Sequence, residues 1–135
     1  MQIVRFHETP KGGSKFQEIE VPFSNPFKDE FDNVYHLTNS LSVEDAVLVE
    51  LPDGLDQSWH NAPTRQLVFV LEGSIEVETS DGSKCSWGKG DLFFADDVAG
   101  KGHLTRVVHG LTKLLFLRLS DQFNLEKFLE DTDKG

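Results

Sequence analysis

Apolar and polar residues alternate along most of the chain, and this period of two predicts short β-strands. The alternating segments are bounded by Gly, Pro, Asn or Asp, and Asp81-Gly82 is typical of a tight hairpin turn. The predicted strands are 2–7, 15–23, 34–38, 46–51, 66–71, 74–79, 92–95, 103–108 and 113–119. We expect the first two to be outer or edge strands. Residues 24–33 carry a proline and many polar residues, so they are expected to form an irregular loop outside the sheet.

Residues 120–131 are the one segment with a convincing helical pattern. Ser120 or Asp121 can cap this helix, and Phe123, Leu125, Phe128 and Leu129 form its apolar face. About nine short strands at regular spacing, followed by a terminal helix, predict an all-β sandwich or barrel. With 135 residues we expect one domain, with N-terminal strands and a loop at 1–44, a barrel core at 45–119, and a C-terminal helix and tail at 120–135.

Charge and composition exclude two classes of partner. The chain has 13 Lys and Arg against 23 Asp and Glu, and a net charge of −10 repels nucleic acids and anionic membranes. Its longest apolar run, LVFVL, is far below the roughly 20 residues of a membrane helix. The single cysteine, Cys85, has no obvious activating base, and the N-terminus lacks the apolar region of a secretory signal. We therefore expect a soluble, cytoplasmic protein.

The stretch from Trp59 to His103 contains most of the glycines, the densest alternation and two of the five histidines. It resembles the cupin superfamily, whose first motif has the form G-x5-H-x-H-x3,4-E-x6-G. Aligned on Gly73, the opening glycine of that motif falls on Gly54. The family's two histidines and glutamate then fall on His60, Ala62 and Gln66.

The second cupin motif, G-x5-P-x-G-x2-H-x3-N, is matched in part. Gly90 opens it and His103 falls at its histidine, but the spacer is longer by two residues and lacks the proline, and Val107 stands at the asparagine position. The resemblance implies an all-β, cupin-like double-stranded β-helix, that is, a jelly-roll barrel, with a short C-terminal helix. It also implies a homodimer, since such barrels often pair through edge strands.

The resemblance points to a pocket inside the barrel with an incomplete set of metal ligands. Cupin metal sites usually combine three histidines with a carboxylate. Here His60, Gln66 and His103 remain, so we expect either no metal or a weakly bound divalent transition metal at these three residues. The same three residues, with Val68 on the strand of Gln66 and Trp59 beside His60, are the candidate ligand-binding residues. His60 and His103 are also the catalytic candidates.

Other polar residues are weighed against simpler explanations. Arg65 neighbours Gln66 on a strand and should face outward, unless a bulge re-aims it toward an anionic ligand. Asp96 and Asp97 are expected to be solvated loop acids. His36 is the one further histidine considered as a replacement for the missing ligand. The Gly100-Lys101-Gly102 segment allows close approach of its backbone to a ligand or another strand.

Three functions are compatible with this pattern. The preserved barrel and reduced ligand set favour a small-molecule-binding protein with weak or absent metal binding. The first alternative is a metal-dependent enzyme of the dioxygenase or isomerase type that uses His60, His103 and possibly Gln66. The second alternative is a regulatory or scaffold cupin without a ligand.

Overall fold

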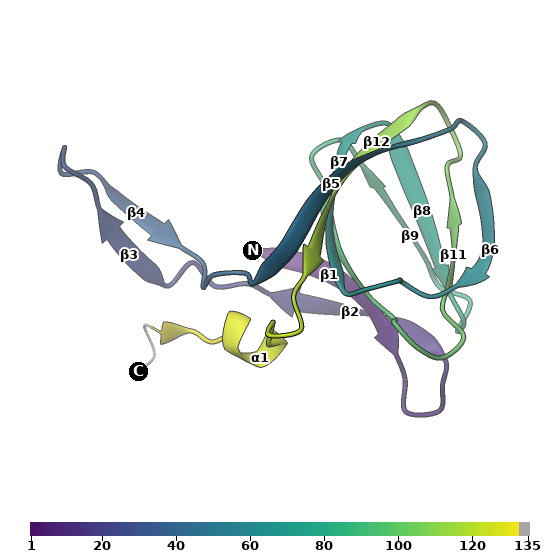
Figure 1. Ribbon diagram of the computed structural model, residues 1–135, viewed down its shortest axis with the longest axis horizontal. Helices are drawn as coiled ribbons and strands as arrows, with labels where there is room; N and C mark the ends of the chain where they lie inside the picture. Colours follow the sequence, from purple (N-terminus) through teal and green to yellow (C-terminus); the bar gives the residue numbers. More distant parts are fainter. Residues whose placement is uncertain (133–135) are drawn as a thin grey trace.

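A six-stranded sheet forms one wall of a β-barrel in the computed structural model, which describes residues 1–132 (Figure 1). The strand order is β2-β1-β10-β7-β12-β5, and all neighbours are antiparallel except β1 and β10. The bounds are β1 Gln2–Glu8, β2 Ser14–Glu20, β5 Val43–Leu51, β7 Gln66–Glu72, β10 Leu92–Asp96 and β12 Thr112–Leu119.

A four-stranded sheet of order β6-β11-β8-β9 faces the first one. Its strands are β6 Asp56–His60, β8 Ser74–Thr79, β9 Lys84–Gly88 and β11 His103–Arg106. Two facing, mostly antiparallel sheets of this kind are a cupin-like jelly roll, so the predicted all-β class is confirmed.

The space between the sheets holds the larger apolar core. Alternate residues of β7, β8 and β10 point into it, as the period of two predicts. Its members include Phe6, Val68, Val77, Trp87 and Phe93, and the ring centroids of Trp87 and Phe93 are 4.2 Å apart. This core fixes which face of each strand looks into the barrel.

The C-terminal helix covers the outer face of the six-stranded sheet and is shorter than predicted. Helix α1 spans Leu125–Phe128 only, because Asn124 rather than Ser120 or Asp121 caps it and accepts a hydrogen bond from the backbone N–H of Lys127. The predicted apolar face is nevertheless used, since Phe123 and Phe128 are buried in a second core cluster. Residues 133–135 of the predicted tail lie outside the described part. No helix within residues 1–132 is long and apolar enough to cross a membrane.

Strand β1 is not the edge strand that the sequence suggested. It lies between β2 and β10, while β2 forms the edge. Both faces of β1 are covered: Ile3 packs in the outer cluster and Phe6 in the core between the sheets. A strand buried on both faces belongs inside a sheet, and the parallel pairing with β10 could not be read from local alternation.

Residues 24–33 do not form the predicted irregular loop. Strands β3 Asn25–Lys28 and β4 Val34–Leu37 pair as a hairpin that projects from the barrel (Figure 1). The turn is organised by Asp29, whose carboxylate accepts hydrogen bonds from the N–H groups of Phe31 and Asn33 and from the Tyr35 hydroxyl. We call this hairpin, residues 25–37, the arm.

Candidate functional site

A cavity of about 530 Å³ lies inside the barrel. Side chains from both sheets line it, and most of these are apolar, including Phe6, Val68, Val77 and Phe93. The polar lining residues are Gln57, His60, Asn61, Gln66, His103, Thr105 and Arg118. A largely apolar cavity with a few polar groups has the character of a small-molecule site.

His60 and His103 meet on neighbouring strands of the four-stranded sheet. They are direct partners across the antiparallel pair β6 and β11, and their ring centroids are 4.4 Å apart. His103 is buried, with its ring 4.7 Å from the ring of Phe6. The two histidines singled out in the sequence are therefore brought together, although 43 positions separate residues 60 and 103.

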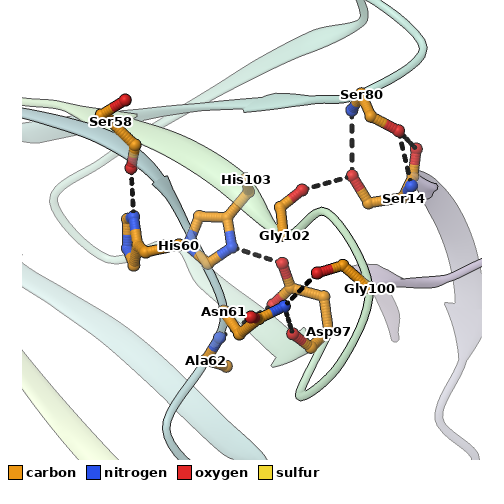
Figure 2. Close-up of polar contacts among 10 residues, drawn as sticks. All are labelled: Ser14, Ser58, His60, Asn61, Ala62, Ser80, Asp97, Gly100, Gly102 and His103. Atoms are coloured by element: carbon orange, nitrogen blue, oxygen red, sulfur yellow. Dashed lines mark hydrogen bonds and ion pairs between the residues drawn. The ribbon is translucent and has the colours of Figure 1, made fainter. Parts of the chain in front are cut away.

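Hydrogen bonds at Nδ1 orient both imidazoles (Figure 2). His60 Nδ1 donates to the carbonyl oxygen of Ser58 at 2.7 Å, and His103 Nδ1 donates to Oδ2 of Asp97 at 2.5 Å. In a neutral ring whose Nδ1 carries the proton, Nε2 is a hydrogen-bond acceptor. Both residues line the cavity, so each leaves Nε2 as the ring nitrogen available to a ligand.

Asp97 is a buried positioning residue and not the solvated loop acid expected from the sequence. Its side chain is fully buried, and Oδ1 accepts a hydrogen bond from the N–H of Ala62 at 3.3 Å. The Asn61 amide donates to the carbonyl oxygens of Asp97 and Gly100, so the two loops are tied together (Figure 2). No sequence signal other than the short separation from His103 pointed to this contact.

Asp96 is also buried, but its ion pairs lie on the opposite face of the six-stranded sheet. Its carboxylate is bound by Arg5, with Nη2 at 2.7 Å from Oδ2, and by Arg65, with Nε at 2.6 Å from Oδ1. The Arg65 guanidinium also lies over the Phe123 ring at 5.0 Å. Arg65 therefore points away from the cavity, as the alternation predicted, and toward an acidic neighbour.

Gln66 and Arg118 bring polar atoms from the six-stranded sheet to the same cavity. The two residues are partners across β7 and β12. Gln66 is 6% exposed, and its side chain lines the cavity. Arg118 donates from Nε to Asp45 at 2.6 Å. The contribution of Arg118 to the cavity was not predicted from the sequence.

The remaining candidates are distributed as follows. Val68 lines the cavity two residues after Gln66. Trp59 does not line it: its side chain is 46% exposed on the other face of β6. His36 lies exposed on the arm and does not replace the missing ligand. Burial raises the pKa of the Cys85 thiol and so disfavours the thiolate.

Gly102 lets the two histidine strands approach one another. It has a φ of +75°, and a Cβ at this position would collide with the backbone carbonyl of His60. Its own carbonyl oxygen accepts a hydrogen bond from the Ser14 hydroxyl at 2.6 Å (Figure 2). The expectation that this glycine segment allows close approach of another strand is therefore met.

These side chains do not fit a tightly held metal ion. Within residues 1–132, no three His, Cys, Asp or Glu side chains are grouped so that they could hold one. The carboxylate of Asp97 is engaged by His103 and Ala62. Two imidazoles and the neutral amide of Gln66 remain, without the third histidine and the anionic ligand that cupin metal sites use.

Comparisons with known proteins find similarity to solved structures alone. No protein-family model and no curated protein sequence matches the chain. Among solved structures it is similar to the DMSP lyase DddQ of Ruegeria pomeroyi, with 24% identity, a TM-score of 0.49, and coverage of 73% of this chain and 46% of that one. The cupin domain of Cnp3 from Schizosaccharomyces pombe has 16% identity and a TM-score of 0.48 over 89% of this chain and 88% of that one.

A 3,4-ketoisomerase of Helicobacter canadensis is also similar, with 17% identity and a TM-score of 0.48 over 82% of this chain and 88% of that one. The two facing sheets form the jelly-roll barrel that the two motifs implied. Similarities of this size carry no conclusion about substrate, metal or reaction.

Proposed function

We propose that this protein binds a small, largely apolar molecule whose hydroxyl or amino head group lies between the histidines and Gln66. The observation that carries this proposal is the pair of imidazoles with Nδ1 already engaged, so that two Nε2 acceptors are left in an otherwise mostly apolar cavity. A ligand that donates hydrogen bonds complements such acceptors.

The energetic reason is the hydrogen bonding of the head group. A neutral hydrogen bond contributes about 0.5–1.5 kcal/mol net, so a head group that bonds to the Gln66 amide or to a histidine Nε2 in the cavity gains affinity. The apolar walls add stabilisation of about 25 cal/mol per Å² of ligand surface removed from water. Head group and apolar body therefore make separate, measurable contributions.

The proposal is tested with alicyclic and aromatic alcohols and amines, each paired with an O-methyl ether or hydrocarbon of the same shape. Binding is measured by calorimetry and by NMR. We expect the donor-bearing member of each pair to bind more tightly, and His60→Ala or His103→Ala to weaken it about 2- to 13-fold, the equivalent of one neutral hydrogen bond. His109→Ala removes an exposed histidine outside the cavity and serves as the matched control.

Equal binding of alcohols and their methyl ethers would refute the assignment of the head group. If a broad library shifts the melting temperature for no compound, the scaffold alternative without a ligand is favoured.

Acid–base catalysis at His103 is a second candidate function, favoured by the Asp97 contact. A buried carboxylate that accepts from Nδ1 holds the imidazole in the tautomer whose Nε2 can accept a proton from a bound substrate. For any bound carbonyl compound, hydrogen–deuterium exchange at the carbon next to the carbonyl reports such a base. We expect exchange with the natural chain and its loss in His103→Ala.

We further propose that no metal is required for binding. Elemental analysis of protein purified without chelators should give well under one equivalent of transition metal, because only two imidazoles and a neutral amide are available. Near-stoichiometric metal that disappears on changing His60 and His103 to Ala would instead support the metal-dependent enzyme.

A further inference from the structure

The polar side chains of the cavity lie at one end of the barrel. Strand β6 ends at His60 and β7 begins at Gln66, and the loop 61–65 joins these two strand ends. His103 is the strand partner of His60, and Arg118 is the strand partner of Gln66. All four side chains line the cavity. Because paired residues lie at the same level of neighbouring strands, the four polar groups are gathered at this end.

The other end of the cavity is lined by hydrocarbon. Leu51, at the end of β5, pairs with Thr112 at the beginning of β12, whereas Arg118 lies near the end of β12. Ile75 lies at the start of β8, and Leu114 follows Thr112 by two residues on the same face of its strand. Leu51, Ile75 and Leu114 all line the cavity. A complementary ligand therefore has an apolar body with its polar groups at one end.

Arg118 gives the polar end a positive charge. Among the residues of 1–132 that line the cavity, it is the one with an Asp, Glu, Lys or Arg side chain. This side chain is 40% exposed, so a residue that also lines the cavity lies at its opening. The chain as a whole has a net charge of −10, which repels anions, and Arg118 is thus a local exception that attracts one.

Asp45 holds the guanidinium of Arg118 through one of its edges. Nε of Arg118 donates to Oδ1 of Asp45 at 2.6 Å. A guanidinium has five N–H donors in a planar fork, and the Nε bond leaves the two Nη groups at its tip as further donors. A carboxylate can accept two parallel hydrogen bonds from such a fork. The contact with Asp45 therefore orients the group and is compatible with a second carboxylate at its tip.

We propose that the ligand of this cavity is a small hydroxy acid whose carboxylate binds Arg118. The inference rests on the proposed function, in which the hydroxyl lies between the histidines and Gln66, and it adds the chemical class of the ligand. Gln66 and Arg118 are neighbours across β7 and β12, so the hydroxyl and the carboxylate are close together on the ligand. An ammonium in place of the hydroxyl would find no Asp or Glu side chain among the lining residues of the described chain.

A set of compounds with one phenyl body separates the two polar contacts. Mandelate carries both the hydroxyl and the carboxylate, phenylacetate lacks the hydroxyl, and 1-phenylethanol has a methyl group in place of the carboxylate. The same set is made with cyclohexyl and isobutyl bodies, and binding is measured by calorimetry and by NMR. We expect the hydroxy acid to bind most tightly in each set, and raised ionic strength to weaken the two acids but not the alcohol.

Substitution of Arg118 tests the carboxylate contact directly. Arg118→Gln should weaken mandelate and phenylacetate roughly tenfold, the lower range for a hydrogen bond to a charged group, because this side chain is 40% exposed. Binding of 1-phenylethanol should not change. Arg118→Lys keeps the charge but loses the planar fork, so its affinity for mandelate should lie between those of Arg118→Gln and the natural chain.

Arg106→Gln is the matched control. Arg106 is 30% exposed, is ion-paired with Glu76 and Glu78, and lies outside the cavity, so its loss removes the same charge elsewhere. This variant should bind mandelate as the natural chain does. Circular dichroism and the melting curve establish that each variant is folded.

The outcomes distinguish this contact from the proposed function. If 1-phenylethanol binds as tightly as mandelate, or if Arg118→Gln weakens mandelate no more than Arg106→Gln does, the carboxylate does not lie on Arg118, and the hydroxyl contact stands alone. If instead phenylacetate equals mandelate and His103→Ala changes neither, the hydroxyl contact is wrong. If no compound of any set binds, the proposed function and the Arg118 contact are both wrong.

Discussion

The contact between Asp97 and His103 supports a quantitative prediction about stability. The Asp97 carboxylate is fully buried and accepts hydrogen bonds from His103 Nδ1 at 2.5 Å and from the N–H of Ala62 at 3.3 Å. Asp97→Ala leaves both donors without that partner. At about 1–3 kcal/mol for each of the two unsatisfied buried groups, the free energy of unfolding should fall by about 2–6 kcal/mol.

For a chain of 135 residues, this loss corresponds to a decrease of about 7–21 °C in melting temperature. Asp97→Asn keeps an oxygen that can accept from Nδ1 and should lose less. Asp56→Ala is the control, because Asp56 is 72% exposed and its cation partner Arg106 is 3.8 Å away, so a change of less than about 1 kcal/mol is expected.

Urea unfolding followed by tryptophan fluorescence measures these differences. The double variant of Asp97→Ala with His103→Ala should be more stable than the sum of the single losses predicts, by about 0.5–3 kcal/mol. If Asp97→Ala is as stable as the Asp56→Ala control, or if the two single losses simply add, then Asp97 does not hold His103 in place and the assignment is wrong.

Four further predictions concern other parts of the molecule. The hydrogen bond to Asp29 raises the pKa of Tyr35, the single tyrosine, so the absorbance titration of the phenol should have its midpoint above 10.0 and move down in Asp29→Asn. Side-chain hydrogen bonds, the largest effect from Asn33 and the next from Tyr35, lower the pKa of Asp29 to about 2. The carboxylate therefore stabilises the turn fully above about pH 4, and this stabilisation is lost as the pH falls through about 2. Amide chemical shifts of the arm measure this loss. Gly102→Ala should destabilise the chain and broaden the histidine NMR signals, because its Cβ collides with the backbone of β6; unchanged spectra would contradict the close approach. Burial raises the pKa of Cys85, so alkylation at pH 7.5 should be slower in the folded chain than in urea, and equal rates would show that the thiol is exposed.

The pattern of the sequence determined the class of fold. In a strand, successive side chains face opposite sides, so Val68, Val70, Ile75 and Val77 could be assigned to the core from their spacing alone. The cupin resemblance placed Gln66 inward, and the same rule then directed its neighbour Arg65 outward. The glycine positions supported the cupin-like arrangement, and two of its motif histidines, His60 and His103, indeed lie side by side.

Contacts between distant residues had no local signature. The burial of Asp97, the ion pairs of Asp96 and the inward placement of Arg118 depend on which strands become neighbours. The arm was misjudged because its proline and its acidic residues suggest a loop, whereas the Asp29 carboxylate accepts hydrogen bonds that form a hairpin turn.

Sequence alone thus determined the residue types, the strand faces and the two histidines of the site. Tertiary structure decided which groups the two imidazoles contact. Pairing of β6 with β11 sets the imidazoles 4.4 Å apart, and the loop after β10 brings Asp97 beneath one of them. Local periodicity specifies the direction of a side chain relative to its own strand, whereas the partner that this side chain meets is set by the packing of the whole barrel.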